Sequence, residues 1–438
     1  MMIRLPPDLP DRFLAANEVH ARPYEPLDIP VRGSYLAIQV ETGQRELERA
    51  HLRTLCERFG SSPPGEDLNQ FSVPFGEFQL KWERHGEFST YIVLVPGLPN
   101  RAFAQPAIEY LPPEWLADIP GQVIVATHAQ VMRAPETPDD PAMLQDFFGA
   151  AAVVGAAIGD GAGFAYTDFK IQHDGFVRFL MLSCAFTDYQ AGRMMQRLFE
   201  IEAYRVLALL ALPIARRESP RVFEIERSLA MLTQEMANED RGDETLLGEL
   251  TQLAAQVESA IASSQYRFGA SRAYNALVTA RISELRERRI TGLQTIEEFM
   301  ARRLSPAMAT CASLSSRLRE LSERVARASS LLSTRVSIAR EKQNQALLGS
   351  MDRRARLQLR LQQTVEGLSV VAISYYVVGL IDYAAKGLEA AGTGIDAAIV
   401  SAVAIPLVAF AVAMTVRWVR RRVVGIAPAH NVPTPIGD

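Results

Sequence analysis

The sequence predicts an α+β domain with a largely antiparallel sheet, followed by a helical region, a long stalk helix and two C-terminal transmembrane helices. Three observations support this prediction. The first part of the chain alternates apolar and polar residues between glycine-containing turns, which is typical of strands. From Tyr189 onward, apolar residues recur at helical spacing. Two apolar runs, 367–385 and 395–416, are each long enough to cross a bilayer as a helix.

Residues 1–186 are expected to form a cytoplasmic α/β domain with an N-terminal arm. The predicted strands are 35–40, 77–82, 90–95, 122–132, 150–158, 164–172 and 176–183, with a helix over 44–59. Turns at 159–163 and 173–175 would join the last three strands into an antiparallel meander. The glycines of the first turn also resemble a phosphate loop, but no Gly-Lys-Ser/Thr follows, and a strand rather than a helix comes next. We therefore expect a hairpin there.

The N-terminal arm contains the motif Glu18-Val19-His20-Ala21-Arg22-Pro23, and prolines at 23, 26 and 30 keep it extended. Glu18 and Arg22 are spaced to form an ion pair, and His20 would titrate near neutral pH. Two interpretations stay open. The arm is either held against the domain by hydrogen bonds, which we favour, or part of a ligand or regulatory site.

Residues 187–304 are predicted to be helical. One helix is expected to end at Pro213, and four more are expected at 221–237, 244–263, 270–289 and 293–304. The segment 240–243, Gly269 and Gly292 are the predicted breaks. Mixed charges along these helices are typical of solvated outer faces.

The stalk helix is expected over residues 305–365, because Ser305-Pro306 has the pattern of a helix start. Apolar residues alternate four and three apart along it, which is the heptad pattern of a helix that packs against a partner. They are Leu314, Leu318, Leu321, Val325, Ala328 and Leu332, then, after a four-residue stutter, Val336, Ala339, Gln343 and Leu347. The partner is either another subunit or the helices just before the stalk. We favour a symmetric homo-oligomer.

Transmembrane helices are predicted over 366–385 and 395–416, with an outer loop at 386–394 and a cytoplasmic tail at 417–438. Arginines precede the first span and follow the second, whereas Lys386 is the lone basic residue of the loop. By the positive-inside rule, both ends of the chain face the cytoplasm. The N-terminal residues lack the apolar core of a signal peptide, which agrees with a cytoplasmic domain.

Two groups of residues near the first span are candidate functional residues. An inner collar consists of Arg353, Arg354, Arg356 and Arg360, with Glu366 at the inner membrane boundary. It would attract anionic headgroups or form a gating ring. Ion-pathway candidates are Ser374, Tyr375, Tyr376, Gly379 and Asp382, where Tyr375, Gly379, Asp382 and Lys386 share one helix face. A carboxylate at the outer mouth would attract cations; alternatively, Asp382 pairs with Lys386 and Gly379 permits close helix packing.

Composition excludes several functions. The net charge of −4 gives no reason to expect nucleic acid as a partner. Three distant cysteines and six histidines never fall at zinc-ligand spacing, so we do not expect a structural zinc site. Binding of a divalent cation stays open, and no other cofactor is expected. No nucleophile–base spacing or phosphate loop is visible, and we do not expect an enzyme. The expected partners are the lipid bilayer and further copies of the chain.

The arm motif, Pro306-Ala307-Met308 and the juxtamembrane stretch 358–376 (QLRLQQTVEGLSVVAISYY) resemble a bacterial family of membrane-anchored proteins described as domain of unknown function 3422. This resemblance implies a bacterial inner-membrane protein and supplies no chemistry. The plan of a cytoplasmic domain, a stalk and two spans is similar to that of CorA-type divalent-cation channels, although their Gly-Met-Asn tripeptide is missing. The resulting expectation is a homo-oligomeric membrane protein that acts as a CorA-like cation channel, or as a scaffold or sensor with a non-conducting anchor.

Overall fold

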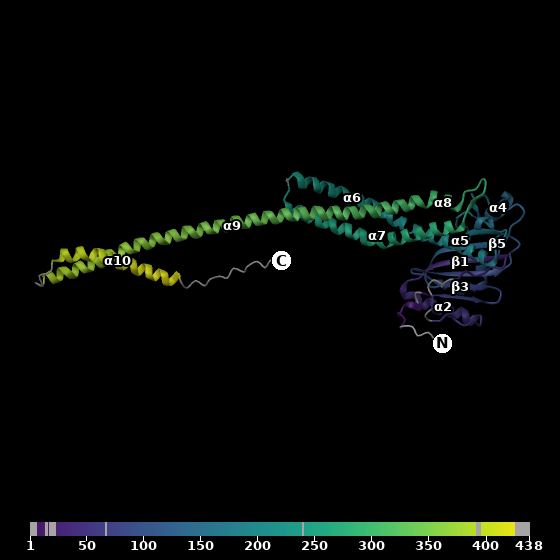
Figure 1. Cartoon of the computed structure of the whole chain (residues 1–438), viewed down its shortest axis with the longest axis horizontal. Coiled ribbons are helices and arrows are strands. Elements are labelled where there is room, and N and C mark those ends of the chain that lie inside the picture. The colour runs from purple at the N-terminus through teal and green to yellow at the C-terminus, as the bar shows by residue number, and fades with distance from the viewer. Residues whose placement is uncertain are drawn as a thin grey trace. The chain divides into compact units, whose positions relative to one another are not determined.

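The computed structural model describes residues 7–13, 16, 23–65, 68–238, 241–390 and 396–424 (Figure 1). The chain divides into two units, Met1–Leu332 and Ser333–Asp438, and each is described by itself. The first unit holds a mixed sheet and a bundle of helices. The second holds most of one long helix and a shorter apolar helix.

The sheet of the first unit has nine strands in the described residues, in the order β2-β3-β4-β1-β5-β8-β7-β6-β9. Their bounds are β1 Val31–Gln39, β2 Gln70–Pro74, β3 Gln79–Arg84, β4 Phe88–Pro96, β5 Gln122–Arg133, β6 Val154–Ile158, β7 Gly163–Thr167, β8 Val177–Ser183 and β9 Arg288–Arg289. All pairs of strands are antiparallel except β5 and β8, which are parallel. The predicted α+β class and the largely antiparallel sheet are therefore confirmed.

The expected hairpin at 159–163 is also confirmed, because β6 and β7 pair directly across it. Elements of this unit that were not predicted include strands β2 and β9 and helix α4 (Pro141–Phe148). Strand β9 has only two residues, and it lies more than a hundred positions after its partner β6. Neither its length nor its sequence neighbourhood gives a strand pattern.

Helix α5 (Asp188–Leu209) packs on one face of the sheet, where Tyr35 of β1 stacks on Phe199 with ring centroids 5.0 Å apart. The opposite face carries α2 (Arg45–Arg58), the 3-10 helix η2 (Ala107–Tyr110) and α3 (Pro113–Ala117) over a second apolar cluster. Glu48 of α2 is fully buried in that cluster. Its carboxylate accepts hydrogen bonds from Trp82 Nε1 at 3.0 Å, the Tyr91 hydroxyl at 3.0 Å and Arg84 at 2.9 Å.

Helices α6 (Ala211–Asn238), α7 (Asp243–Leu285) and the start of α9 (Ser305–Ala390) form a bundle around a third cluster (Figure 1). The first part of the stalk seam, Leu314 to Leu332, is buried there against α6 and α7. For this part of the seam the preference for another subunit was wrong, since helices of the same chain cover it. Apolar residues at heptad spacing require a partner, but they do not say which chain supplies it.

Two predicted helix breaks were also misplaced. Helix α7 runs through Gly269, because this exposed glycine costs a helix only about 1 kcal/mol while its neighbours Phe268 and Ser271 are buried by tertiary contacts. The break expected at Pro213 lies earlier, since α5 ends at Leu209 and Pro213 falls in the first turn of α6, where proline is tolerated. The short α8 (Ile296–Arg303) precedes α9.

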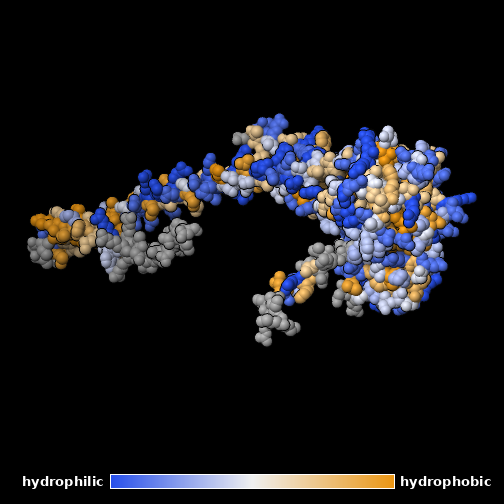
Figure 2. All heavy atoms as spheres, turned by 45° about the vertical axis from the view of Figure 1, so that its right-hand side comes forward, coloured by the Kyte–Doolittle hydropathy of each residue, from blue (hydrophilic) through white to orange (hydrophobic). Residues whose placement is uncertain are grey.

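In the second unit, α9 continues to Ala390 and α10 runs over Ala397–Val424. Each contains a segment that is long and apolar enough to cross a membrane, by length and composition alone. Large apolar side chains are exposed along both helices, as at Leu368, Leu380 and Phe410. Figure 2 shows these hydrophobic residues gathered near the end of α9 and over α10.

Candidate functional site

The N-terminal arm is attached to the sheet at the point where the Glu18–Pro23 motif ends. The Lys81 ammonium of β3 donates to the Pro23 carbonyl at 2.6 Å, and Gln79 donates to the Glu25 carboxylate at 2.7 Å. Further along, the Leu27 N–H donates to the Asp188 carbonyl at 3.1 Å, and the Leu27 side chain is buried. The arm is thus held by hydrogen bonds from Pro23 onward, as one of the two interpretations expected.

The arm passes close to helix α5 at Gly192, which has no side chain. A Cβ atom built on Gly192 would lie 1.8 Å from the Glu25 carbonyl oxygen, far inside van der Waals contact. Any other residue there would move either the arm or the helix. Glycine at this position therefore fixes where the arm crosses α5.

Beneath the arm, Lys81 is almost completely buried and has two side-chain partners besides the Pro23 carbonyl. Its ammonium lies 3.0 Å from the Glu83 carboxylate and 3.2 Å from the Gln196 side-chain oxygen. A buried ammonium needs such partners, because losing its hydration without compensation would be very costly. The three acceptors together replace the water shell of the ammonium.

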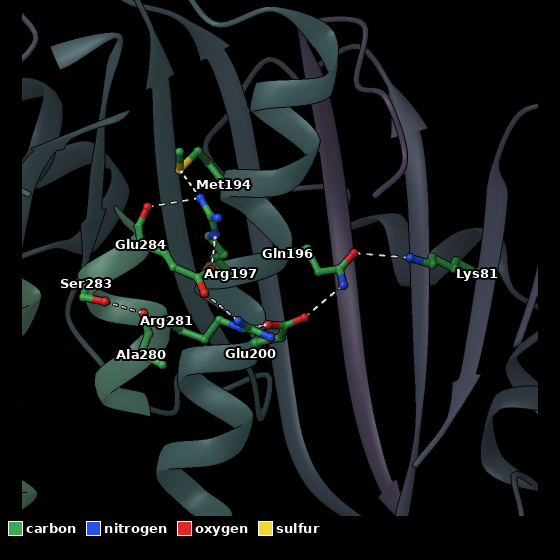
Figure 3. Close-up of polar contacts among 9 residues, drawn as sticks. All are labelled: Lys81, Met194, Gln196, Arg197, Glu200, Ala280, Arg281, Ser283 and Glu284. Carbon is green, nitrogen blue, oxygen red and sulfur yellow. Dashed lines mark hydrogen bonds and ion pairs between the residues drawn. The ribbon is translucent and has the colours of Figure 1, made fainter. Parts of the chain in front are cut away.

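Gln196 begins a polar network that joins α5 to α7 (Figure 3). Its amide donates to Glu200 at 2.9 Å, and Glu200 in turn forms an ion pair with Arg281 of α7. Arg281 also contacts Glu284 at 2.9 Å, which accepts from Arg197 of α5 at 2.8 Å. Positive and negative groups alternate along this path, so the network compensates its own charge.

Burial and charge in the network shift two pKa values. Burial raises the pKa of the Tyr35 hydroxyl well above its usual value, with further contributions from Tyr204 and Glu200. Burial alone would lower the pKa of Arg281, but Glu200 and Glu284 outweigh it and the net shift is upward. Tyr35 therefore stays neutral and Arg281 stays charged, and neither group is poised for proton transfer near neutral pH.

The structure places the other predicted residues as follows. Glu18, His20 and Arg22 lie outside the described residues, whereas Pro23 is the acceptor for Lys81. Ser374, Tyr375, Tyr376, Gly379 and Asp382 all lie on α9, and the rings of Tyr375 and Tyr376 meet edge to face at 5.9 Å. Arg353, Arg354, Arg356, Arg360 and Glu366 lie on the same helix, where Arg356 pairs with Asp352 at 2.7 Å.

Asp382 has two partners within the second unit. One carboxylate oxygen accepts from the Ser401 hydroxyl of α10 at 2.7 Å, and the other lies 2.8 Å from the Lys386 ammonium. The predicted pairing with Lys386 is therefore present. The contact with Ser401 was not predicted, because it joins the two helices across the connecting loop.

Sequence reasoning missed Lys81, Glu83, Gln196 and the α5–α7 ion pairs. One signal was available: Gln79, Lys81 and Glu83 occupy alternate positions of a strand, so they share one face. A polar face on an inner strand predicts a covered polar site. No metal site accompanies it, since the described residues contain no group of three or more His, Cys, Asp or Glu side chains that would hold an ion.

Comparison with known proteins identifies a family. A family model described as "Protein of unknown function (DUF3422)" matches residues 7–423, which is most of the chain. No curated protein and no solved structure matches.

Proposed function

The chain belongs to the DUF3422 family, and we propose that it is a membrane-anchored binding protein, a scaffold or sensor, whose two apolar helices form a non-conducting anchor. The observation that supports this most is the pairing of Asp382 with both Ser401 and Lys386. Asp382 is the carboxylate that a cation channel would need at its outer mouth. Here its two oxygens are engaged by a hydroxyl and an ammonium, so they attract cations poorly.

The exposed apolar side chains of α9 and α10 support the anchor. Soluble proteins rarely leave large contiguous apolar patches in water, and hydrocarbon is the cover that two helices of this length fit. The collar arginines before the first apolar segment and Arg417 after the second favour a cytoplasmic position for both flanks by the positive-inside rule. The proposed location is the bacterial inner membrane, with both chain ends in the cytoplasm.

The binding role is supported by the arm site. The arm motif ends at Pro23, whose carbonyl accepts a hydrogen bond from the buried Lys81. Lys81 also donates to Gln196, the first residue of the network that reaches α7. A ligand or protein that displaces the arm would expose Lys81 and change the partners of Gln196. Such a displacement would carry a signal from the arm to the helices.

A flux assay on purified protein in liposomes tests the anchor against the CorA-like channel. We expect Mg²⁺, Co²⁺ and K⁺ fluxes equal to those of protein-free liposomes. A cation flux above that background that Asp382→Lys alters, in protein that still folds, would contradict the non-conducting anchor and support the channel. Val371→Ala is the matched control, because it changes an exposed apolar residue of the same segment.

Self-association is a separate proposal. The end of the seam, with Ala339, Gln343 and Leu347, is exposed in a single chain and would be covered in a homo-oligomer. Native mass spectrometry of nanodisc-embedded protein, with and without millimolar divalent cations, measures the subunit number. A monomer under both conditions would contradict the proposed homo-oligomer.

A further inference from the structure

A second polar cluster lies on the α2 side of the sheet, on the face opposite Lys81, and the proposed function does not use it. Arg32 and Ser34 of β1 face Gln130 and His128 of β5 across the ladder, and His128 faces Arg178 of β8. Because directly paired residues project from the same face of a sheet, these five side chains share one face. We call them the arginine strip.

Arg32 is the unusual member of the arginine strip. Its side chain is buried, with 6% of the residue exposed, and among the described residues it has no carboxylate partner. Its guanidinium donates instead to the Gly97 carbonyl at 3.0 Å and the Tyr110 hydroxyl at 2.9 Å, and within the described part of the chain its Nε has no acceptor. A buried guanidinium with only neutral acceptors is costly, and an anion is the partner that would compensate it.

The rest of the strip adds donors without adding a carboxylate for Arg32. Arg178 pairs with Asp174 at 3.0 Å, and its Nε also lacks an acceptor among the residues that the structure describes. The Ser34 hydroxyl oxygen accepts the Ile108 N–H at 3.0 Å and lies 2.8 Å from His128 Nδ1. Burial lowers the pKa of His128 to about 4, so at neutral pH His128 contributes a hydrogen-bonding ring and no charge.

The segment 97–110 covers the strip as a loop whose two ends are tied to Arg32, through Gly97 and Tyr110. Its tip inserts Phe103 beneath the surface, where the ring lies under the Arg178 guanidinium at 5.0 Å and meets Phe147 of α4 edge to face. Phe103 has a φ of 57°, a conformation that a bulky residue adopts only at a cost. Such strain persists where the surrounding contacts enforce it.

We propose that the arginine strip is a binding site for a small oxyanion, a phosphate or carboxylate group of a soluble ligand, with Arg32 as its principal ligand and the loop 97–110 as its cover. The Gly97 carbonyl and the Tyr110 hydroxyl accept the hydrogen bonds of the Arg32 guanidinium that the oxyanion would accept. Binding exchanges these neutral acceptors for a charged one, and charge-assisted hydrogen bonds from arginine to an oxyanion are the stronger kind. The loop must move to admit the ligand, so binding would also change its position.

Calorimetric titration of the full chain in zwitterionic nanodiscs tests this. The probes are inorganic phosphate and pyrophosphate in one arm and succinate and citrate in the other, with chloride as the reference. We expect saturable binding in at least one arm, and the arm that responds identifies the group. No saturable binding of any probe at millimolar concentration would overturn the proposal.

Three variants separate a binding role from a structural one. Arg32→Gln should weaken binding roughly tenfold or more. Arg49→Gln removes a guanidinium that likewise has two neutral acceptors, the backbone carbonyls of Gly65 and Leu68, and should leave binding unchanged. Tyr110→Phe removes a competing acceptor from Arg32, so it should tighten binding by roughly twofold to tenfold. If Arg32→Gln does not fold, the Tyr110→Phe result decides: weaker or unchanged binding would contradict the site.

Discussion

The two units of this chain differ in how their side chains are covered. In the first unit the fully buried carboxylate of Glu48 has partners from the same chain, Trp82, Tyr91 and Arg84. In the second unit large apolar side chains such as Tyr375 and Phe410 are 77% and 69% exposed. The contrast teaches that the first unit is stabilised by its own contacts, while the second requires a cover from outside the chain. We propose that this cover is the bilayer.

The largest expected effect comes from removing one partner of a buried ion pair in the first unit. Glu48→Ala leaves Arg84 buried without its carboxylate and frees two further donors, so it should lower the free energy of unfolding by about 3–5 kcal/mol. Thermal and chemical unfolding of detergent-solubilised protein, followed by tryptophan fluorescence, measures it. Glu46→Ala, on the exposed side of the same helix, is the control and should change little. Equal effects of both variants would contradict the description of this core.

The second-largest expected effect concerns the apolar segments of the second unit. Val371→Asp places a charge in the exposed apolar segment of α9, towards its start; a charged residue costs about 2.5–3.5 kcal/mol at the centre of a membrane helix and less near an end. We expect less protein in the carbonate-resistant membrane fraction and an unchanged unfolding temperature of the first unit. Leu347→Asp, on the same helix before the apolar segment, should leave the membrane fraction unchanged. If Leu347→Asp reduced it as much as Val371→Asp, the assignment of the span would be wrong.

The smallest effect is a pH dependence within the first unit. The pKa of His128 falls from 6.5 to about 4 on folding, mainly through burial. Because the unfolded state then binds more protons, this contribution to stability is present above pH 6.5 and is lost as the pH falls towards 4. Between pH 7 and pH 5 the loss should be about 2 kcal/mol.

Comparing unfolding at pH 7 and pH 5 in wild type and His128→Gln isolates this contribution. The carboxylates and His51, whose pKa burial also lowers, titrate in both proteins. We therefore expect the difference between the two pH values to shrink in the variant. The same pH slope in both proteins would show that His128 does not titrate on unfolding.

Local patterns predicted much of the fold, and non-local pairings account for what they missed. Alternation in the first half predicted strands such as β4 and β5, but the parallel pairing of β5 with β8 depends on segments about fifty residues apart. The heptad seam of α9 was predicted correctly as a packing surface, although its partner from Leu314 to Leu332 is α6 and α7 rather than another subunit.

In the candidate sites, too, local patterns were visible in the sequence and contacts between distant residues were not. The arm motif was visible as a local sequence, and its end at Pro23 does lie at a polar site. Lys81 and Gln196 are 115 positions apart, and Ser34 and His128 are 94 positions apart. No spacing rule joins such residues before the sheet is built. Asp382 was identified, but its contact with Ser401 depends on how α10 packs on α9.

The central claim, a cytoplasmic binding domain on a two-span anchor, is tested most directly by cysteine labelling in intact spheroplasts. Cys184 of the first unit is exposed, whereas Cys56 and Cys311 are buried, and Ala390→Cys adds a thiol at the end of α9. With a membrane-impermeant maleimide, we predict labelling of the new cysteine in intact spheroplasts and of Cys184 only after lysis. Labelling of Cys184 in intact spheroplasts, or of the new cysteine only after lysis, would contradict the account.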